Sequence, residues 1–140
     1  MPDVQRFAVD CELFGAQGIT VHPRPDERHI RVEDVYQLKS MITTEFNIEG
    51  NPTDEFIDLV TSVRPTQVTL VPDSPSQLTS NHGWNTKKHL DVLKGIVNQL
   101  HASRMRAFHL TFFIRTEINM LGEELITVHY NIFLTRKGDT

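Results

Sequence analysis

Short runs of β-branched and aromatic residues alternate along the chain with longer stretches in which apolar residues recur every three or four positions. The short runs predict buried strands, and the longer stretches predict amphipathic helices. We expect strands at 18–22, 44–49, 67–71 and 106–114, and helices at 3–14, 32–42, 53–63 and 86–101. Strands that alternate with helices of about three turns are typical of a parallel sheet with right-handed crossovers.

The strands begin at intervals of roughly 25 residues or more, which favours a (β/α) TIM-type barrel. Four such strands make only part of a barrel, and a flavodoxin-like open sheet is the competing α/β architecture. We expect one domain over 1–140, with a tail of unassigned origin at 115–140. Within this tail, 124–135 alternates at period two and predicts an extra C-terminal strand. We expect that strand to cover an open edge of the incomplete barrel.

Charge and composition exclude several classes of protein. The formal net charge is −4, which argues against a nucleic-acid partner because binding phosphates requires a basic face. No apolar run approaches the roughly 20 residues of a membrane helix, and the first residues contain no apolar signal region. The lone Cys11 cannot form an internal disulfide. These features predict a cytoplasmic protein without a membrane partner.

Polar residues gather where the predicted strands end, which is where parallel α/β folds bind ligands. His22, Arg24 and His29 follow the first strand, and Glu49 ends the second. Arginine suits phosphate or carboxylate oxygens, and histidine transfers protons near neutral pH. Burial of the glutamate would raise its pKa and make it a usable acid or base. A hydroxyl of the 73–85 loop, from Thr79 or Ser80, could hold another oxygen.

Each candidate also has an ordinary structural explanation. His22 could be a hydrogen-bonded loop histidine, Glu49 could cap a helix or pair with an arginine, and the arginines could form a solvated face beside Asp26 and Glu27. His22, His29 and Glu49 could also bind zinc or iron. The abundant arginine favours an anionic substrate over a metal.

Four stretches of the sequence together resemble a known family. They are GITVHPRPDERHI at 18–30, FNIEGNP at 46–52, QVTLVPD at 67–73 and LTS at 78–80. In order and spacing they are similar to pyridoxine 5′-phosphate synthase, an enzyme of vitamin B6 biosynthesis. The resemblance covers residues 5–101.

The resemblance implies a transferase with a TIM barrel that needs neither a metal nor an organic cofactor. Its phosphorylated substrates would be 1-deoxy-D-xylulose 5-phosphate and 3-amino-2-oxopropyl phosphate, which condense to pyridoxine 5′-phosphate, phosphate and water. By this resemblance, His22 and Glu49 would have acid–base roles, and Arg24, His29 and Thr79 would bind the deoxyxylulose phosphate. It also implies assembly into a homo-oligomer.

Compared with that family, we expect this chain to be truncated at both ends. It lacks the family's first strand, which carries a substrate-binding asparagine, and a later histidine that donates a proton. The alternative function is therefore a catalytically inactive barrel fragment that retains only an anion-binding loop. From the isolated chain we expect weak binding of phosphate esters and little or no turnover.

Overall fold

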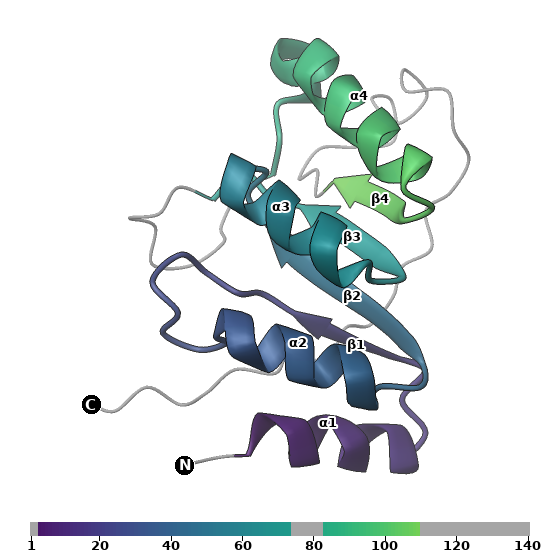
Figure 1. Cartoon of the computed structure of the whole chain (residues 1–140). Helices are drawn as coiled ribbons and strands as arrows, with labels where there is room; N and C mark the ends of the chain where they lie inside the picture. Colours follow the sequence, from purple (N-terminus) through teal and green to yellow (C-terminus); the bar gives the residue numbers. More distant parts are fainter. Residues whose placement is uncertain (1–2, 74–82, 110–140) are drawn as a thin grey trace.

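The computed structural model describes residues 3–73 and 83–109. Within them four strands form one parallel sheet in the order β1-β2-β3-β4 (Figure 1). The strands are β1 (Gly18–Val21), β2 (Glu45–Gly50), β3 (Gln67–Leu70) and β4 (Arg106–His109). The helices are α1 (Val4–Leu13), α2 (Val32–Met41), α3 (Asp54–Val63) and α4 (Thr86–Ala102).

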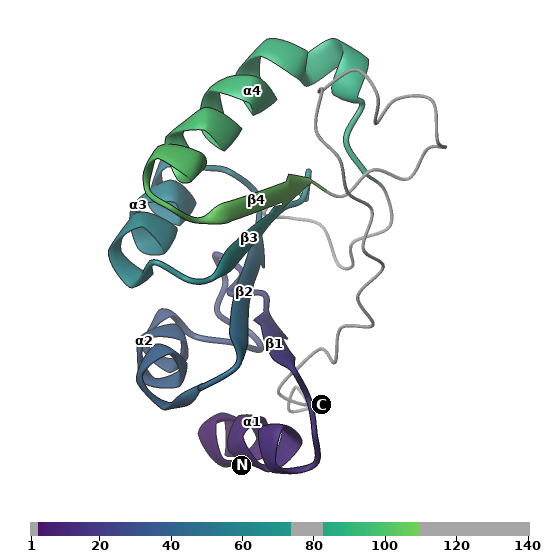
Figure 2. The same cartoon turned by 90° about the vertical axis from the view of Figure 1, so that its right-hand side faces the viewer.

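The sheet has the connectivity of a barrel. Each strand pairs with the next strand in the sequence, and the intervening helices α2, α3 and α4 all cover the same face of the curved sheet (Figure 2). A flavodoxin-like sheet reverses its strand order and carries helices on both faces. The partial TIM-type barrel predicted from the sequence is therefore confirmed, and the described part of the sheet is open at β1 and β4.

The two faces of each strand carry different side chains, because successive residues of a strand point in opposite directions. The residues that face the helices are apolar and fully buried. They are Ile19 and Val21 of β1, Phe46 and Ile48 of β2, and Val68 and Leu70 of β3. The alternate positions of β2 are Asn47 and Glu49, so both polar side chains belong to the face away from the helices.

Local sequence signals explain where the elements begin and end. The Thr53 hydroxyl accepts a hydrogen bond from Phe56 N at 3.3 Å, which confirms Thr53 as the N-cap of α3. Gly15, with φ at +99°, ends the turn after α1. The prediction for 106–114 is confirmed at 106–109. The rest of that strand and the tail strand at 124–135 lie outside the described residues.

No helix in the described part of the chain is long and apolar enough to cross a membrane.

Candidate active site

A tight turn at the end of β1 positions the first candidate residues. Glu27 N donates to Arg24 O at 2.9 Å, which closes a β-turn with Pro25 at its second position. Proline is favoured there because its fixed φ matches the turn. The Glu27 carboxylate then accepts from Val32 N at 2.9 Å and so ties the loop to the start of α2. The loop that carries Arg24 is therefore held at both ends.

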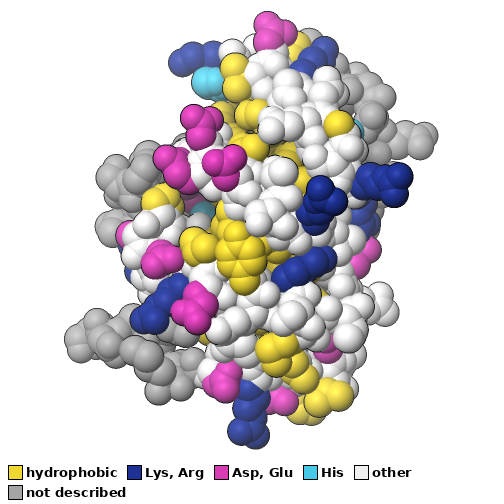
Figure 3. All heavy atoms as spheres, viewed as in Figure 1, with side chains coloured by type: hydrophobic (Ala, Val, Ile, Leu, Met, Phe, Trp, Pro, Cys, Tyr) yellow, Lys and Arg dark blue, Asp and Glu magenta, His cyan; other side chains and the backbone are white. Residues whose placement is uncertain are grey.

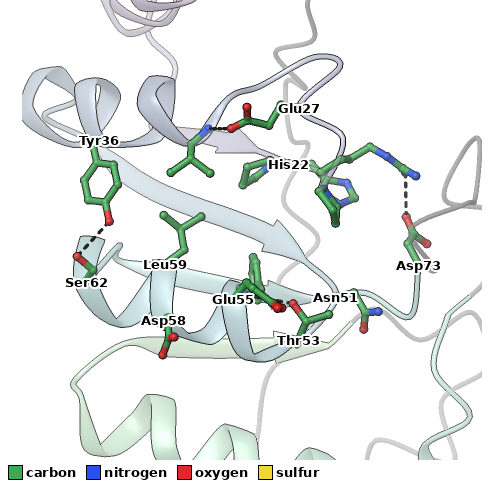
Figure 4. Close-up of a pocket in the computed structure, with 15 residues that line it drawn as sticks. His22, Glu27, Tyr36, Asn51, Thr53, Glu55, Asp58, Leu59, Ser62 and Asp73 are labelled. Carbon is green, nitrogen blue, oxygen red and sulfur yellow. Dashed lines mark hydrogen bonds and ion pairs between the residues drawn. The ribbon is translucent and has the colours of Figure 1, made fainter.

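The side chain of Arg24 lies inside the protein, with only 7% of its surface exposed. Its Nη1 lies 3.8 Å from the carboxylate of Asp73, which follows β3 (Figure 4). Its Nε lies 3.9 Å from Asp26. Asp26 also pairs with Arg28 at 3.0 Å. Arg28 thus pairs with a carboxylate of its own loop, whereas Arg24 is directed across the strand ends.

Glu49 is buried on β2, and no described residue forms a hydrogen bond or ion pair with its carboxylate. Burial, helped by the negative charge of Asp73, raises the pKa of Glu49 to about 7. A group with that pKa is present in both its acid and its base form at neutral pH. Of the readings that the sequence left open, the helix cap and the arginine pair are not formed.

His22 comes directly after the paired part of β1, at the level where β2 continues with Glu49. Val21 pairs with Ile48, so the residue after each stands at the neighbouring strand end. Burial lowers the pKa of His22, and the positive charges of Arg24 and Arg28 act in the same direction, while Asp73 and Asp26 oppose them. The imidazole is therefore largely neutral at pH 7 and able to accept a proton.

A hydrogen-bonded polar row crosses the same face of the sheet, one position below these groups. Asn47 donates to the Thr20 hydroxyl at 3.3 Å and accepts from the Thr69 hydroxyl at 3.1 Å. The row links β1, β2 and β3, and it gives the buried polar side chains partners. Its only sequence signal was a polar residue at alternate strand positions.

The structure says less about the other two predicted site residues, His29 and Thr79. His29 is half-buried in the β1–α2 loop, and Thr79 lies outside the described residues. Sequence reasoning missed Asp73, which is 5% exposed and interacts with Arg24, His22 and Glu49. The signal that could have found it is its position as a carboxylate immediately beyond a parallel strand.

A cavity of about 840 Å³ opens beside the loop that carries Arg24. It runs from His22, Arg24 and Asp73 into the groove between α2 and α3, where apolar side chains gather on the surface (Figures 3 and 4). Glu49 and His29 do not line it. Glu49 belongs to the face of the sheet away from the helices, so the cavity reaches the part of the candidate site that His22, Arg24 and Asp73 form.

Among residues 3–73 and 83–109, no three His, Cys, Asp or Glu side chains are grouped so that they could hold a metal ion. His22, His29 and Glu49 therefore do not form a ligand set in the described structure.

Comparison with known proteins identifies one family. A family model described as pyridoxal phosphate biosynthesis protein PdxJ matches residues 1–129. The matched range extends beyond residues 5–101, where the sequence resembles the synthase, and reaches into the tail.

Several similar proteins are named pyridoxine 5′-phosphate synthase. The protein of Parabacteroides distasonis is 59% identical over 118 residues, which are 84% of this chain and 48% of that protein. The protein of Porphyromonas gingivalis is 58% identical over 122 residues, or 87% of this chain and 50% of the relative. That of Bacteroides thetaiotaomicron is 61% identical over 105 residues, or 75% and 44%. The resemblance is confirmed, and this chain spans about half the length of the relatives it matches.

Proposed function

Because this chain belongs to the family of pyridoxal phosphate biosynthesis protein PdxJ, we propose that it supplies acid–base and phosphate-binding residues of a pyridoxine 5′-phosphate synthase. The proposed reaction condenses 1-deoxy-D-xylulose 5-phosphate with 3-amino-2-oxopropyl phosphate. The observation that carries the proposal is the buried Glu49 near the end of β2, next to the strand end that His22 and the buried Arg24 follow. Proton-transfer groups and a phosphate-binding group then lie at the same edge of the sheet.

Ring closure requires several proton transfers, since carbonyl additions and eliminations of water and phosphate alternate. A carboxyl group with a pKa of about 7 can donate a proton in one step and take one up in the next. His22, largely neutral, is the complementary base. His22 and Glu49 follow residues that pair in neighbouring strands, Val21 and Ile48, and this supports a shared reacting region.

Binding of the phosphate ester is assigned to Arg24, with His29 and Thr79 as further ligands. A guanidinium presents five N–H donors in a fixed fork, so Arg24 can keep its carboxylate partner and still bind phosphate oxygens. Its position on a loop closed by a β-turn supports a defined orientation. No metal or organic cofactor takes part in the proposed reaction.

Calorimetric titration with 1-deoxy-D-xylulose 5-phosphate tests the binding role, with unphosphorylated 1-deoxy-D-xylulose as the control ligand. We expect binding that depends on the phosphate and weakens at least about tenfold in Arg24→Gln, since a charge-assisted bond contributes about 1.5–3 kcal/mol. Arg31→Gln, an exposed arginine of the same loop, is the matched control and should bind normally. Equal binding of both ligands would contradict the assignment.

Incubation with both substrates tests the chemistry, with product followed by its absorbance. We expect slow product formation that falls at least about a hundredfold in Glu49→Gln, the usual scale of general acid–base catalysis. Product formed as fast by Glu49→Gln as by the unchanged chain would remove Glu49 from the mechanism. Binding of the ester without product from any variant would contradict turnover by this chain.

The cellular setting is also proposed. The lone Cys11 fits the reducing cytoplasm, where small phosphorylated metabolites occur, and self-association would cover the open edges of the described sheet. Sedimentation of the purified chain over a range of concentrations tests the homo-oligomer.

A further inference from the structure

Asp73 is a buried carboxylate to which neither the sequence nor the family resemblance gives a role. It follows β3, whose pairing with β2 continues through a hydrogen bond from Val71 N to Gly50 O at 3.0 Å. This extension of the sheet fixes the backbone two residues before Asp73. The carboxylate is 5% exposed, so its position reflects packing at the strand ends and not a solvated loop.

Charged groups that interact with Asp73 come from the ends of β1 and β2. His22 and Arg24 follow β1, and Glu49 lies near the end of β2. A carboxylate at this point acts on the proposed phosphate-binding and proton-transfer groups at once.

Asp26 and Asp73 both lie near the Arg24 guanidinium, and their ion pairs with it differ in strength. Asp26 is 3.9 Å from Nε, but its side chain is 44% exposed and it is shared with Arg28 at 3.0 Å. Asp73 lies 3.8 Å from Nη1 with a side chain that is 4% exposed. Solvent weakens an exposed pair far more than a buried one. Of these two carboxylates, Asp73 is therefore the one that restrains the orientation of Arg24 more strongly.

We propose that Asp73 is a positioning residue, whose buried carboxylate holds the Arg24 guanidinium in the orientation that binds the phosphate group of the substrate. The inference rests on the proposed function and adds to it a residue that acts through Arg24 without touching the substrate. Pairing with one carboxylate leaves other N–H donors of the guanidinium for phosphate oxygens.

The negative charge of Asp73 supplies a second, independent signature. It is the second cause, after burial, of the raised pKa of Glu49. At His22 it works against the effect of burial, which lowers the pKa. Removal of the charge should therefore lower both pKa values, which a merely structural role would not require.

The charge of Asp73 also allows an experiment to distinguish a positioning role from a purely electrostatic one. Considered only as a charge, Asp73 repels the phosphate, so Asp73→Asn would tighten ester binding. Considered as a positioning residue, it orders Arg24, so the same variant would weaken binding. The two effects have opposite signs, and a loss of affinity in Asp73→Asn identifies positioning.

The experiment titrates the full chain and its variants with 1-deoxy-D-xylulose 5-phosphate and with the unphosphorylated sugar. We expect Asp73→Asn to lose at least about tenfold in affinity for the ester alone, on the scale of one charge-assisted contact. Asp73→Glu should recover part of the loss. Asp58→Asn, which removes an exposed carboxylate lining the cavity beside the site, is the matched control and should bind normally.

Two further measurements complete the test: the affinity of a double variant at Asp73 and Arg24, and the pKa of His22. In the Arg24→Gln background, Asp73→Asn should cause no further loss of affinity, and NMR should show a lower pKa for His22 in Asp73→Asn but not in Asp58→Asn. Asp73→Asn that binds the ester as tightly as the unchanged chain, or more tightly, would overturn the inference. Absence of phosphate-dependent binding in the unchanged chain would instead overturn the proposed function.

Discussion

Replacement of Glu49 by glutamine should stabilise the protein at alkaline pH and leave its stability nearly unchanged in acid. The pKa of Glu49 is raised from 4.5 to about 7 by burial and by Asp73. Below pH 4.5 the carboxyl group is protonated in the folded and the unfolded chain, so it adds no electrostatic cost. Between pH 4.5 and 7 the unfolded chain ionises first, and folding increasingly requires a proton.

The size of the effect follows from the two pKa values. Each pH unit between them corresponds to about 1.4 kcal/mol, so the full penalty above pH 7 is about 3 kcal/mol. Glutamine fills nearly the same volume without a charge and removes the penalty. At pH 8 the midpoint of urea unfolding should rise by about 1–2 M for a slope typical of a domain this size.

Urea denaturation of both proteins at pH 4.5 and pH 8, followed by circular dichroism, measures the difference. Glu55→Gln is the control of opposite sign. Hydrogen bonds at the start of α3 lower the pKa of Glu55, so its ionised form stabilises the fold above pH 4.5 and that stability is lost in acid. Glu55→Gln should therefore be the less stable variant at pH 8. A Glu49→Gln protein no more stable than the unchanged chain at pH 8 would refute burial as the cause.

Three further substitutions test the fold around the site. Gly50→Ala should destabilise by about 1–3 kcal/mol, because the new methyl group would meet the Phe56 ring at 2.3 Å, and unchanged thermal unfolding would contradict this packing. Thr53→Ala should cost about 1 kcal/mol through loss of the α3 N-cap, and Thr53→Ser should restore most of it in the same melting experiment. Asn47→Ala breaks the polar row between β1 and β3 and should cost about 1–3 kcal/mol in urea unfolding; a neutral result would show that the row does not stabilise the sheet.

The alternation of strands and helices could be predicted because each element has a strong local pattern. The apolar face of α3 and its Thr53 cap are visible in consecutive residues, and the structure has both. The strand boundaries differ from the expected ones by one residue at β1, β2 and β3. β1 ends at Val21, one residue before His22, because Pro23 has no backbone N–H to continue the pairing. Where a strand ends depends on its pairing with the neighbouring strand, which the local sequence does not show.

Part of the candidate site could be predicted from the rule that ligand-binding residues lie at the ends of parallel strands. That rule identified His22, Arg24 and Glu49, and it allowed the raised pKa of the buried glutamate to be expected. It did not separate Arg24 from Arg28, because only the folded structure shows which one is buried against Asp73. A carboxylate such as Asp73 looks like any solvated loop residue until three strands are brought together.

The pKa of Glu49, followed by NMR in the free chain and during addition of phosphate ester, tests the central claim most directly. Glutamate side chains labelled with ¹³C report the titration, and Glu49→Gln identifies the signal. The account predicts a pKa near 7 and a signal that shifts when 1-deoxy-D-xylulose 5-phosphate is added but not when the unphosphorylated sugar is added. A carboxylate that titrates near 4.5 and ignores both ligands would contradict an acid–base group beside a phosphate-binding site.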